Sequence, residues 1–417
     1  MLLVELTHTS HTLAATGIQQ VCRHLYAEMT KLGRVEAIVF DPWQRSWRTA
    51  CAAEKIRLRP DGTEGVARRK GEVWKTGVKI SGLARRWTGI KGPFPANAGG
   101  VLMPEFVSNR CLDALPRLRA LLPETAPIAA VFHDAIALRF PEISARETVE
   151  RFPRYVRELA SLDAVAAVSE ASKVELLGLW EKMGIADVPP VVVIPLGIEP
   201  PRTDDARPAP PFGEDSQGPR VLCVSTLEPR KNHAALLDAA EKLWTEGVKF
   251  RLELVGMAHR ELGAPIVAKI SEAEAKNRQI VWRGAVENAV LRSLYRACDF
   301  TIYCSLMEGF GLPVFESLAY RKPCVCTTCG ALDEASTGGG CLRLEGTDAC
   351  PIAEGLRRMI ADKALREKLA AEAASRTIRT WADYAKDMLA FSEGIRPRSR
   401  KTDAQAQNVL PKPCPSR

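Results

Sequence analysis

Two glutamates separated by seven residues, Glu308 and Glu316, are the residues whose types and spacing point most directly to chemistry. Between them, Gly309 and Gly311 allow backbone conformations that residues with a Cβ atom resist, and the proline that follows suits the first turn of a helix. Such a loop presents free helix N-terminal amides to an anion. Carboxylates repel phosphate, but they accept hydrogen bonds from sugar hydroxyls. The segment therefore predicts a site for a sugar that carries a diphosphate.

The position of this pair distinguishes it from the glutamates of an ordinary helix start, which merely complement the helix dipole. Residues 299–303 predict a strand that ends just before the pair. Open α/β sheets bind ligands at the carboxyl ends of their strands. We therefore expect Glu308 and Glu316 to face a ligand cleft.

Two adjacent cations, Arg230 and Lys231, follow another predicted strand and precede a helix. A solvated pair of cations is the alternative interpretation, but like charges ahead of a helix N-terminus are unfavourable unless an anion binds there. We expect them to neutralise a diphosphate beside the Glu308 loop.

The N-terminal half contributes two weaker candidates at strand ends. His133 follows an apolar strand and either contacts a sugar, transfers a proton or simply bonds to Asp134. Gly17 lies between the first strand and its helix, where glycine lets the backbone approach a phosphate or a sugar.

Alternating strand-like and helix-like segments must position these residues, and they occur twice along the chain. We expect strands at residues 2–6, 35–40, 128–132, 164–168, 191–194, 221–225, 250–255, 280–282, 300–303 and 324–327. We expect helices after Gly17 and at residues 234–244, 267–276, 289–297 and 314–320. Repeated βα units predict the α/β class, with parallel sheets covered by helices on both faces.

The predicted organisation is two Rossmann-like doubly wound domains that face each other across a cleft. A proline-rich stretch at residues 199–219 is the expected linker. It separates an acceptor-side domain (1–198) from a donor-binding domain (220–378). A C-terminal helix (379–395) is expected to return to the first domain, and the basic tail (396–417) to be disordered.

The composition is that of a soluble globular protein, with 46% hydrophobic and 26% charged residues in 417. The first residues are typical of a strand rather than of a signal peptide, and no apolar run approaches the roughly 18 residues of a membrane span. Because the 12 cysteines are scattered, we expect reduced thiols and a cytoplasmic protein. Cys326 and Cys329 have the spacing of half a zinc site without a second half, so we expect no metal.

Much of the net charge of +8 comes from residues 68–91, which contain eight basic residues and a single acidic residue, Glu72, with aromatic and aliphatic side chains between the basic ones. This composition is typical of a peripheral contact with an anionic membrane, here the inner face of the cell membrane. A solvated basic loop or a nucleic-acid patch is the alternative, although we expect no nucleic-acid partner.

In these motifs the chain, up to about residue 390, resembles the family-4 retaining glycosyltransferases of the GT-B fold. Residues 308–316 match that family's Glu-x7-Glu motif with its Gly-Phe-Gly-Leu-Pro core. The resemblance implies that Glu316 binds the ribose hydroxyls and Glu308 the donor sugar. It also implies that the amides of Phe310, Gly311 and Leu312 bind the diphosphate.

The resemblance assigns the remaining candidates in the same way. Lys231 matches the phosphate-binding lysine, with Arg230 beside it, and Arg283 lies in the region that usually frames the nucleotide base. His133 matches a residue placed against the transferred sugar, and Gly17 matches the N-terminal glycine loop.

Two positions depart from the family pattern. Thr226 stands where many relatives carry another phosphate-binding arginine, and Gln20 stands where related N-terminal loops often have arginine. The first departure leaves the diphosphate to Arg230 and Lys231.

The expected function is the transfer of a hexose from a nucleoside diphosphate sugar to a saccharide or lipid-linked acceptor in cell-surface polysaccharide or lipopolysaccharide synthesis. The resemblance implies retention of the anomeric configuration. The segment before Asn232 resembles bacterial mannosyltransferases and favours GDP-mannose over UDP-glucose, UDP-galactose or dTDP-rhamnose. No cofactor is expected beyond this co-substrate. The alternatives are a nucleotide-sugar epimerase or hydrolase of the same fold, or a non-enzymatic membrane-associated scaffold.

Overall fold

The computed structural model describes residues 1–12, 17–33, 35–60, 76–106, 108–201, 208–212 and 217–398. Parts of three predicted segments lie outside the described residues. They are residues 68–75 of the basic segment, residues 202–207 and 213–216 of the expected linker, and the tail from residue 399 onward.

The first sheet contains β1 (Leu2–Glu5), β2 (Val35–Asp41), β3 (Ser46–Thr49), β4 (Gly100–Met103), β5 (Ile128–Phe132), β6 (Ala164–Ala167) and β7 (Val191–Val193). Its spatial order is β3-β2-β1-β4-β5-β6-β7. All neighbours are parallel except β2 and β3, which pair antiparallel at one edge. The order reverses between β1 and β4, and such a switch point is where doubly wound sheets bind ligands.

The second sheet contains β8 (Arg220–Val224), β9 (Arg251–Val255), β10 (Ile280–Trp282), β11 (Phe300–Tyr303), β12 (Cys324–Cys326) and β13 (Cys341–Arg343). It is parallel throughout, in the order β10-β9-β8-β11-β12-β13. Its switch point lies between β8 and β11, the two strands that precede Lys231 and Glu308.

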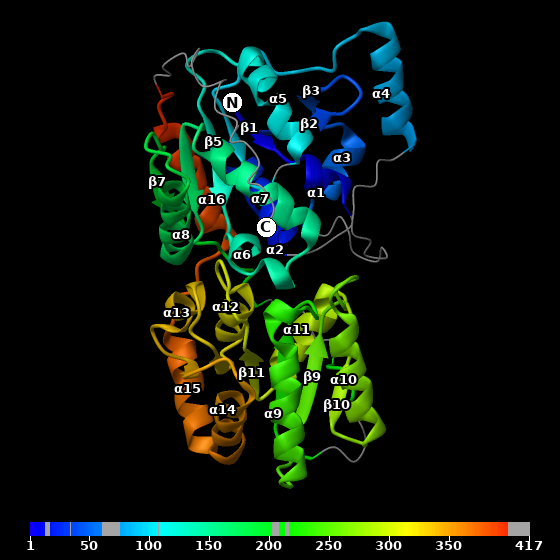
Figure 1. The fold of residues 1–417 in the computed structure, drawn as a ribbon, viewed down its shortest axis with the longest axis vertical. Coiled ribbons are helices and arrows are strands. Elements are labelled where there is room, and N and C mark those ends of the chain that lie inside the picture. The colour runs from blue at the N-terminus through cyan, green and yellow to red at the C-terminus, as the bar shows by residue number, and fades with distance from the viewer. Residues whose placement is uncertain are drawn as a thin grey trace, which may run out of the picture.

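Helices connect these strands and cover both sheets (Figure 1). The described helices of the N-terminal half are α1 (Thr7–His11), α2 (Gly17–Leu32), α3 (Ala52–Arg57), α4 (Thr76–Thr88), α5 (Asn109–Leu121), α6 (Ile136–Arg139), η1 (Pro141–Ile143), α7 (Arg146–Leu159) and α8 (Glu170–Lys182). Those that follow are η2 (Pro229–Lys231), α9 (His233–Thr245), α10 (Ala264–Ala275), α11 (Asn288–Ala297), α12 (Leu312–Ala319), α13 (Ala331–Ser336), α14 (Ala349–Ala361), α15 (Lys363–Ser375) and α16 (Trp381–Gly394). In the described parts of the chain, none of the helices combines the length and the apolar character that crossing a membrane requires.

Strand periodicity explains why each sheet has two apolar faces. Along β5, Ile128, Ala130 and Phe132 pack into one core cluster, whereas Ala129 and Val131 pack into another on the opposite face. Side chains that alternate along a strand point to opposite faces, so a strand buried on both sides is continuously apolar.

The last helix, α16, packs on the first sheet and not on the second. Trp381, Tyr384 and Met388 are buried in the same cluster as residues of α2 and β1. A parallel bridge between Ile198 and Thr380 aligns the two chain segments that pass from one half of the molecule to the other. Figure 1 shows α16, in red, beside the strands of the first half.

Three strands were not expected from the sequence, and they change the strand count but not the fold class. The polar β3 forms an antiparallel edge, and β4 and β13 are short strands that follow glycines. In consequence His133 follows the fifth strand along the chain rather than the third.

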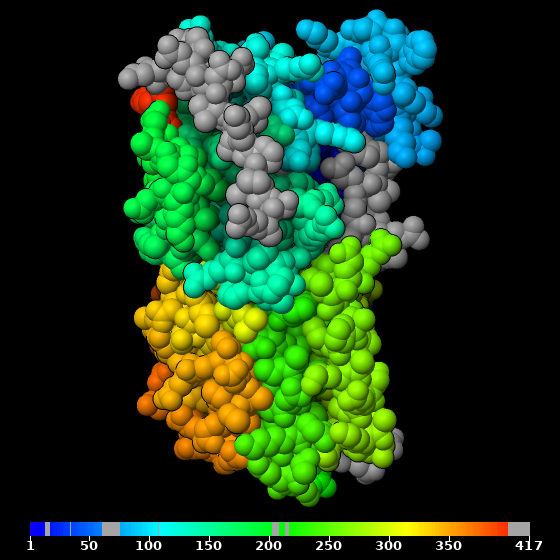
Figure 2. Space-filling model, viewed as in Figure 1, coloured from blue at the N-terminus to red at the C-terminus, as the bar shows by residue number. Residues whose placement is uncertain are grey.

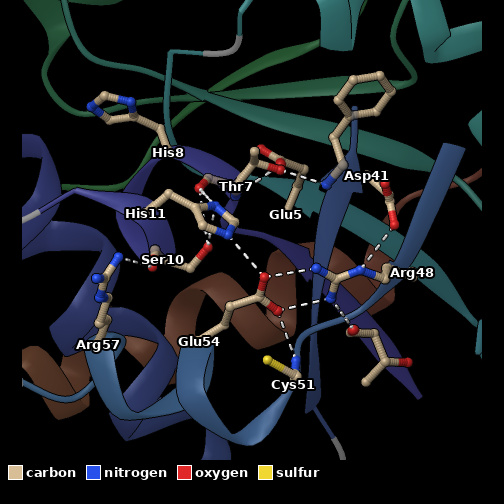
Figure 3. A network of polar contacts seen from close by, with 12 residues as sticks. Glu5, Thr7, His8, Ser10, His11, Asp41, Arg48, Cys51, Glu54 and Arg57 are labelled. Carbon is tan, nitrogen blue, oxygen red and sulfur yellow. Dashed lines mark hydrogen bonds and ion pairs between the residues drawn. The ribbon is translucent and has the colours of Figure 1, made fainter. Parts of the chain in front are cut away.

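A buried polar network of His11, Asp41, Arg48 and Glu54 joins α1, β2, β3 and α3 (Figure 3). Arg48 donates to both oxygens of Glu54 at 2.8 and 2.7 Å, and His11 Nε2 lies 2.8 Å from Glu54 Oε1. The network continues through Asp41, which accepts hydrogen bonds from Arg85 of α4 at 3.1 and 2.8 Å. Burial alone raises the pKa of Glu54, but the hydrogen bonds and charge of Arg48 outweigh it and hold that pKa well below its usual value.

Candidate functional site

A cleft of about 410 Å³ lies between the carboxyl ends of the two sheets. It is lined by residues of both halves, and it contains every site residue predicted from the sequence except Arg283. These are Gly17, His133, Arg230, Lys231, Glu308, Gly309, Phe310, Gly311, Leu312 and Glu316.

The loop after β11 has the geometry expected of an anion site. Gly311 precedes α12 with φ of 93°, a left-handed conformation that glycine adopts without strain, and Pro313 lies in the first turn. The amides of residues 310–312 donate no hydrogen bond to any described residue. Three donors at a helix N-terminus thus remain available to a ligand oxygen.

A group of four charged side chains, here called the cleft cluster, lies beside this loop: Glu228, Arg230, Lys231 and Glu308. Lys231 Nζ lies 2.6 Å from Glu308 Oε1, and Arg230 Nη1 lies 3.0 Å from Glu308 Oε2. Arg230 also donates to Glu228 at 2.8 Å. Tyr303, the last residue of β11, accepts from Lys231 at 2.6 Å and donates to Glu308 at 2.9 Å.

The charges of the cleft cluster determine its protonation. Burial opposes ionisation of Glu308, but Arg230 and then Lys231 outweigh it and lower the pKa to about 2. Burial and then the adjacent charge of Arg230 lower the pKa of Lys231. Glu308 is therefore a carboxylate at neutral pH, so it can accept hydrogen bonds but cannot act as a general acid.

Glu316, the second glutamate of the motif, lies on α12 away from these cations. Its Oε2 accepts a hydrogen bond of 2.7 Å from the Tyr295 hydroxyl, and the Tyr295 ring stacks on Tyr320 with centroids 5.2 Å apart. Burial raises its pKa, and the Tyr295 hydrogen bond opposes that shift. This hydrogen bond orients the carboxylate in the wall of the cleft, where it can accept from hydroxyl groups.

On the opposite wall, His133 follows β5 and is held as a neutral ring. Its Nε2 lies 2.8 Å from the carbonyl oxygen of Pro104, which can only accept, so Nε2 carries the proton. Burial lowers the pKa of His133, with the Pro104 hydrogen bond and the charge of Asp134 opposing that shift. His133 therefore offers an acceptor nitrogen, Nδ1, rather than a positive charge.

Gly309 is the point at which the two walls touch. A Cβ atom on it would lie 2.1 Å from the carbonyl oxygen of His133. The Gly309 carbonyl accepts from Ser169 Oγ at 2.7 Å and from Ser172 Oγ at 3.1 Å, both from the N-terminal half. Nearby, the Glu334 carboxylate accepts from two amides at the start of α8, at 3.0 and 2.7 Å. The donor-side loop is thus held against the first domain by specific hydrogen bonds.

Arg283 is the predicted donor-binding residue that the structure places elsewhere. Its guanidinium pairs with the buried Glu253 of β9 and donates to the Pro211 carbonyl at 2.9 Å. Glu253 also pairs with Arg220 at 2.6 Å. Arg283 therefore neutralises a buried carboxylate in the second sheet and does not line the cleft.

The sequence prediction missed several residues that support the site. Tyr303 and Tyr295 orient the two glutamates, and Ser169 and Ser172 hold Gly309. Tyr303 had a usable signal, because it ends a predicted strand five residues before Glu308. The serines carried only the signal of a helix N-cap, which their own hydrogen bond at the start of α8 already accounts for.

Known proteins share parts of this sequence and the fold of the chain. Residues 207–376 match the family described as glycosyl transferases group 1. The chain is 26% identical over 353 residues to the serotype-specific mannosyltransferase WbdA of Escherichia coli, covering 78% of this chain and 38% of that protein. It is also 26% identical over 237 residues to the O-antigen chain mannosyltransferase B of Escherichia coli, covering 57% and 62%.

The fold resembles a crystal structure of Anabaena Alr3699/HepE in complex with UDP and glucose. The TM-score is 0.63 with 16% identity, over 94% of this chain and 99% of the other. This similarity concerns the fold alone, and the chain spans only 38% of the length of WbdA. Residues 207–376 of the chain therefore carry a group 1 glycosyltransferase domain, and the two parallel sheets have the GT-B fold that the sequence predicted.

Proposed function

We propose that this chain transfers a hexose, with mannose favoured, from a nucleoside diphosphate sugar to a saccharide or lipid-linked acceptor in cell-surface polysaccharide or lipopolysaccharide synthesis. The observation that carries the proposal is the cleft cluster beside the amides of residues 310–312, which donate no hydrogen bond to any described residue. The group 1 domain supports sugar transfer, and the names of the two Escherichia coli relatives support mannose and a polysaccharide product.

In this proposal the diphosphate binds between the helix amides and the two cations. Because Glu228 and Glu308 already neutralise Arg230 and Lys231, the incoming phosphates compete for the same guanidinium and ammonium groups. Their arrival frees lone pairs of Glu308 for the hydroxyls of the transferred sugar, and Glu316 accepts from the ribose. The cations and amides carry the charge of the leaving group, with no metal ion or further cofactor required.

The proposed reaction retains the anomeric configuration through front-face displacement. The bond between the anomeric carbon and the diphosphate oxygen breaks as the acceptor hydroxyl oxygen bonds to the same face of that carbon. The hydroxyl proton passes to the departing phosphate oxygen. No nucleophilic role is assigned to Glu308, because in this proposal its carboxylate accepts hydrogen bonds from hydroxyls of the transferred sugar.

Calorimetry with nucleotide sugars tests the proposal. GDP-mannose is expected to bind more tightly than UDP-glucose, and Glu316→Ala to weaken binding about 10- to 100-fold through loss of hydrogen bonds to a charged acceptor. Glu272→Ala, on the exposed face of α10, is the matched control. The absence of binding to any nucleotide sugar, or unchanged affinity in Glu316→Ala, would overturn the assignment.

Product analysis separates transfer from hydrolysis. With GDP-mannose as donor, GDP release should depend on the acceptor, and the sugar should appear on the acceptor with its anomeric configuration kept. Equal GDP release with and without acceptor would instead support a nucleotide-sugar hydrolase.

A further inference from the structure

We propose that α4 and the residues after it, 76–91, form a docking surface for an anionic phospholipid membrane. This surface lies on the first domain, where α4 projects from the β3 edge of the sheet (Figures 1 and 2). The inference goes beyond glycosyl transfer and does not depend on it, because it concerns a surface outside the cleft.

The side of α4 that faces the protein is defined by close contacts. A Cβ atom on Gly82 would lie 2.2 Å from the ring of Trp43, so glycine is needed for this approach. Arg85 pairs with Asp41 at 2.8 Å, and Val78 is buried on the same side of the helix. These three positions, spaced by four and three residues, form one helix face.

The opposite face of α4 is apolar and exposed. At about 100° per residue, Ile80, Leu83 and Trp87 lie on a stripe that points away from the face containing Gly82. They are 62%, 43% and 88% exposed, and Ile90 beyond the helix end is 66% exposed. Single exposed apolar residues are common on protein surfaces, but a stripe of large ones on one helix marks a contact site.

The charges around this stripe identify the occupant as an anionic surface. Residues 76–91 contain no aspartate or glutamate. Lys79, Arg86 and Lys91 are exposed and form no ion pair with any described residue. Lys79 and Arg86 flank one side of the stripe. An amphipathic helix with tryptophan on its apolar face and basic residues beside it is the arrangement that inserts among anionic headgroups.

The contacts that attach α4 keep this surface in place. Gln44, in the turn between β2 and β3, donates to the Ile90 carbonyl at 2.6 Å and accepts from the Gly92 amide at 3.0 Å. Asp41, the partner of Arg85, also belongs to the buried polar network (Figure 3). The apolar stripe is thus presented by a helix anchored to the sheet.

Vesicle flotation of the full chain tests the proposal. The protein should float with phosphatidylcholine vesicles that contain phosphatidylglycerol and stay behind with phosphatidylcholine alone. An Ile80→Ser/Trp87→Ser variant should lose binding about tenfold or more, because the apolar area that enters the membrane is removed. A Lys79→Gln/Arg86→Gln variant should lose binding about 25-fold, since each basic residue near an anionic surface contributes roughly a factor of five.

Two matched variants control for surface apolarity and charge. Val174→Ser removes a 67% exposed apolar residue from α8, and Lys368→Gln removes an exposed cation from α15. Both should float like the wild type. All variants should melt within a few degrees of it, because surface substitutions change stability little.

Equal flotation of the α4 variants and the wild type would overturn the proposal, as would failure of the wild type to bind the phosphatidylglycerol vesicles. Sedimentation of the protein without vesicles provides a further test. A dimer that dissociates in the Ile80→Ser/Trp87→Ser variant would show that a second copy of the chain, not a membrane, covers this face.

Discussion

The cleft cluster and the buried polar network both join carboxylates to guanidinium groups, but they differ in exposure. Side chains of the buried network are at most 3% exposed, whereas those of the cleft cluster are 10% to 22% exposed. Both assemblies combine acids and bases at similar distances. The comparison shows that ion pairing alone does not distinguish a candidate binding site from a structural network, whereas amides unpaired among the described residues and a cleft beside the ion pairs do.

The comparison predicts that the two assemblies affect different properties of the protein. Breaking the cleft cluster should reduce donor binding and turnover, because its cations face the cleft. Breaking the buried network should reduce stability, because it leaves charges without partners in the protein interior.

The largest effect is expected from Lys231→Met. It removes the cation closest to Glu308, and kcat/KM for the donor should fall about 100- to 1000-fold, as for loss of a charge-stabilising group. The free energy of unfolding should change little, because burial already disfavours the charged lysine. Steady-state kinetics and urea unfolding measure the two quantities.

The control for this change is Lys242→Met, which removes an exposed lysine from α9. It should leave both quantities unchanged. If Lys231→Met instead lowered the free energy of unfolding strongly and left donor binding unchanged, the cleft cluster would have a structural role like that of the buried network.

Glu54→Gln is the reciprocal change. Arg48 would lose the closer of its two carboxylate partners in the interior and keep only Asp41, at 3.4 Å, so the free energy of unfolding should fall by about 3 kcal/mol, with donor affinity unchanged. Glu150→Gln breaks an exposed pair with Arg146 and should leave the free energy of unfolding almost unchanged, because solvent screens this pair. Denaturant titration of both variants checks the contrast, and equal losses would contradict it.

Lowering the pH should reduce the free energy of unfolding through His233, which lies next to the cleft cluster at the start of α9. Burial, and next the charge of Lys231, lower its pKa to about 3, and Nε2 lies 3.0 Å from Ser225 Oγ. The unfolded chain takes up this proton below its ordinary pKa of 6.5, whereas the native protein does not until about 3. The stability that this histidine contributes is therefore fully present above pH 6.5, and it is lost as the pH falls below that value.

As the pH falls from about 6.5 to about 5, protonation of this histidine in the unfolded chain should lower the free energy of unfolding by about 2 kcal/mol. Unfolding titrations across that range measure the slope, and His233→Gln should flatten it. Lys231→Met should flatten it in part, because the lysine charge contributes to the shift. A slope that neither substitution alters would assign the acid sensitivity to other groups.

The smallest effect is expected from Ser172→Ala, which removes a hydroxyl that lies 2.7 Å from the His133 carbonyl oxygen and 3.1 Å from the Gly309 carbonyl oxygen, and which leaves both charged assemblies intact. Loss of about 1 kcal/mol corresponds to an increase of about fivefold in the donor KM. Ser375→Ala, whose hydroxyl bonds only within α15, is the matched control. An unchanged donor KM in Ser172→Ala would show that the serine contact does not set the position of the loop.

Most of the fold and the cleft could be predicted because their signals are local. Glu308 and Lys231 lie within a few residues of apolar strands, and parallel strands bring their carboxyl ends to one edge. Strand β3 was missed because it is short, polar and antiparallel, so that it lacks the continuous apolar run of the central strands.

What the sequence could not predict involves partners that are distant in sequence. Arg283 follows a strand as a ligand-binding residue would, but Glu253, on the adjacent strand, pairs with it instead. Ser172 and Gly309 are separated by 137 residues, and nothing near either residue indicates that they meet. Local patterns identify which residues reach the edge of a sheet, whereas their partners across the edge depend on the docking of the domains.

Gly309 connects the two halves of the molecule, and under the proposed function it would also couple the two substrates. If the halves of the molecule separate, its carbonyl leaves Ser169 and Ser172, and the loop whose amides face the donor loses its support. A donor that favours the closed arrangement therefore also favours the arrangement in which His133 borders the acceptor side. If both proposed substrates favour this arrangement, each strengthens binding of the other by the same factor, so a single glycine without a side chain would make the two affinities interdependent.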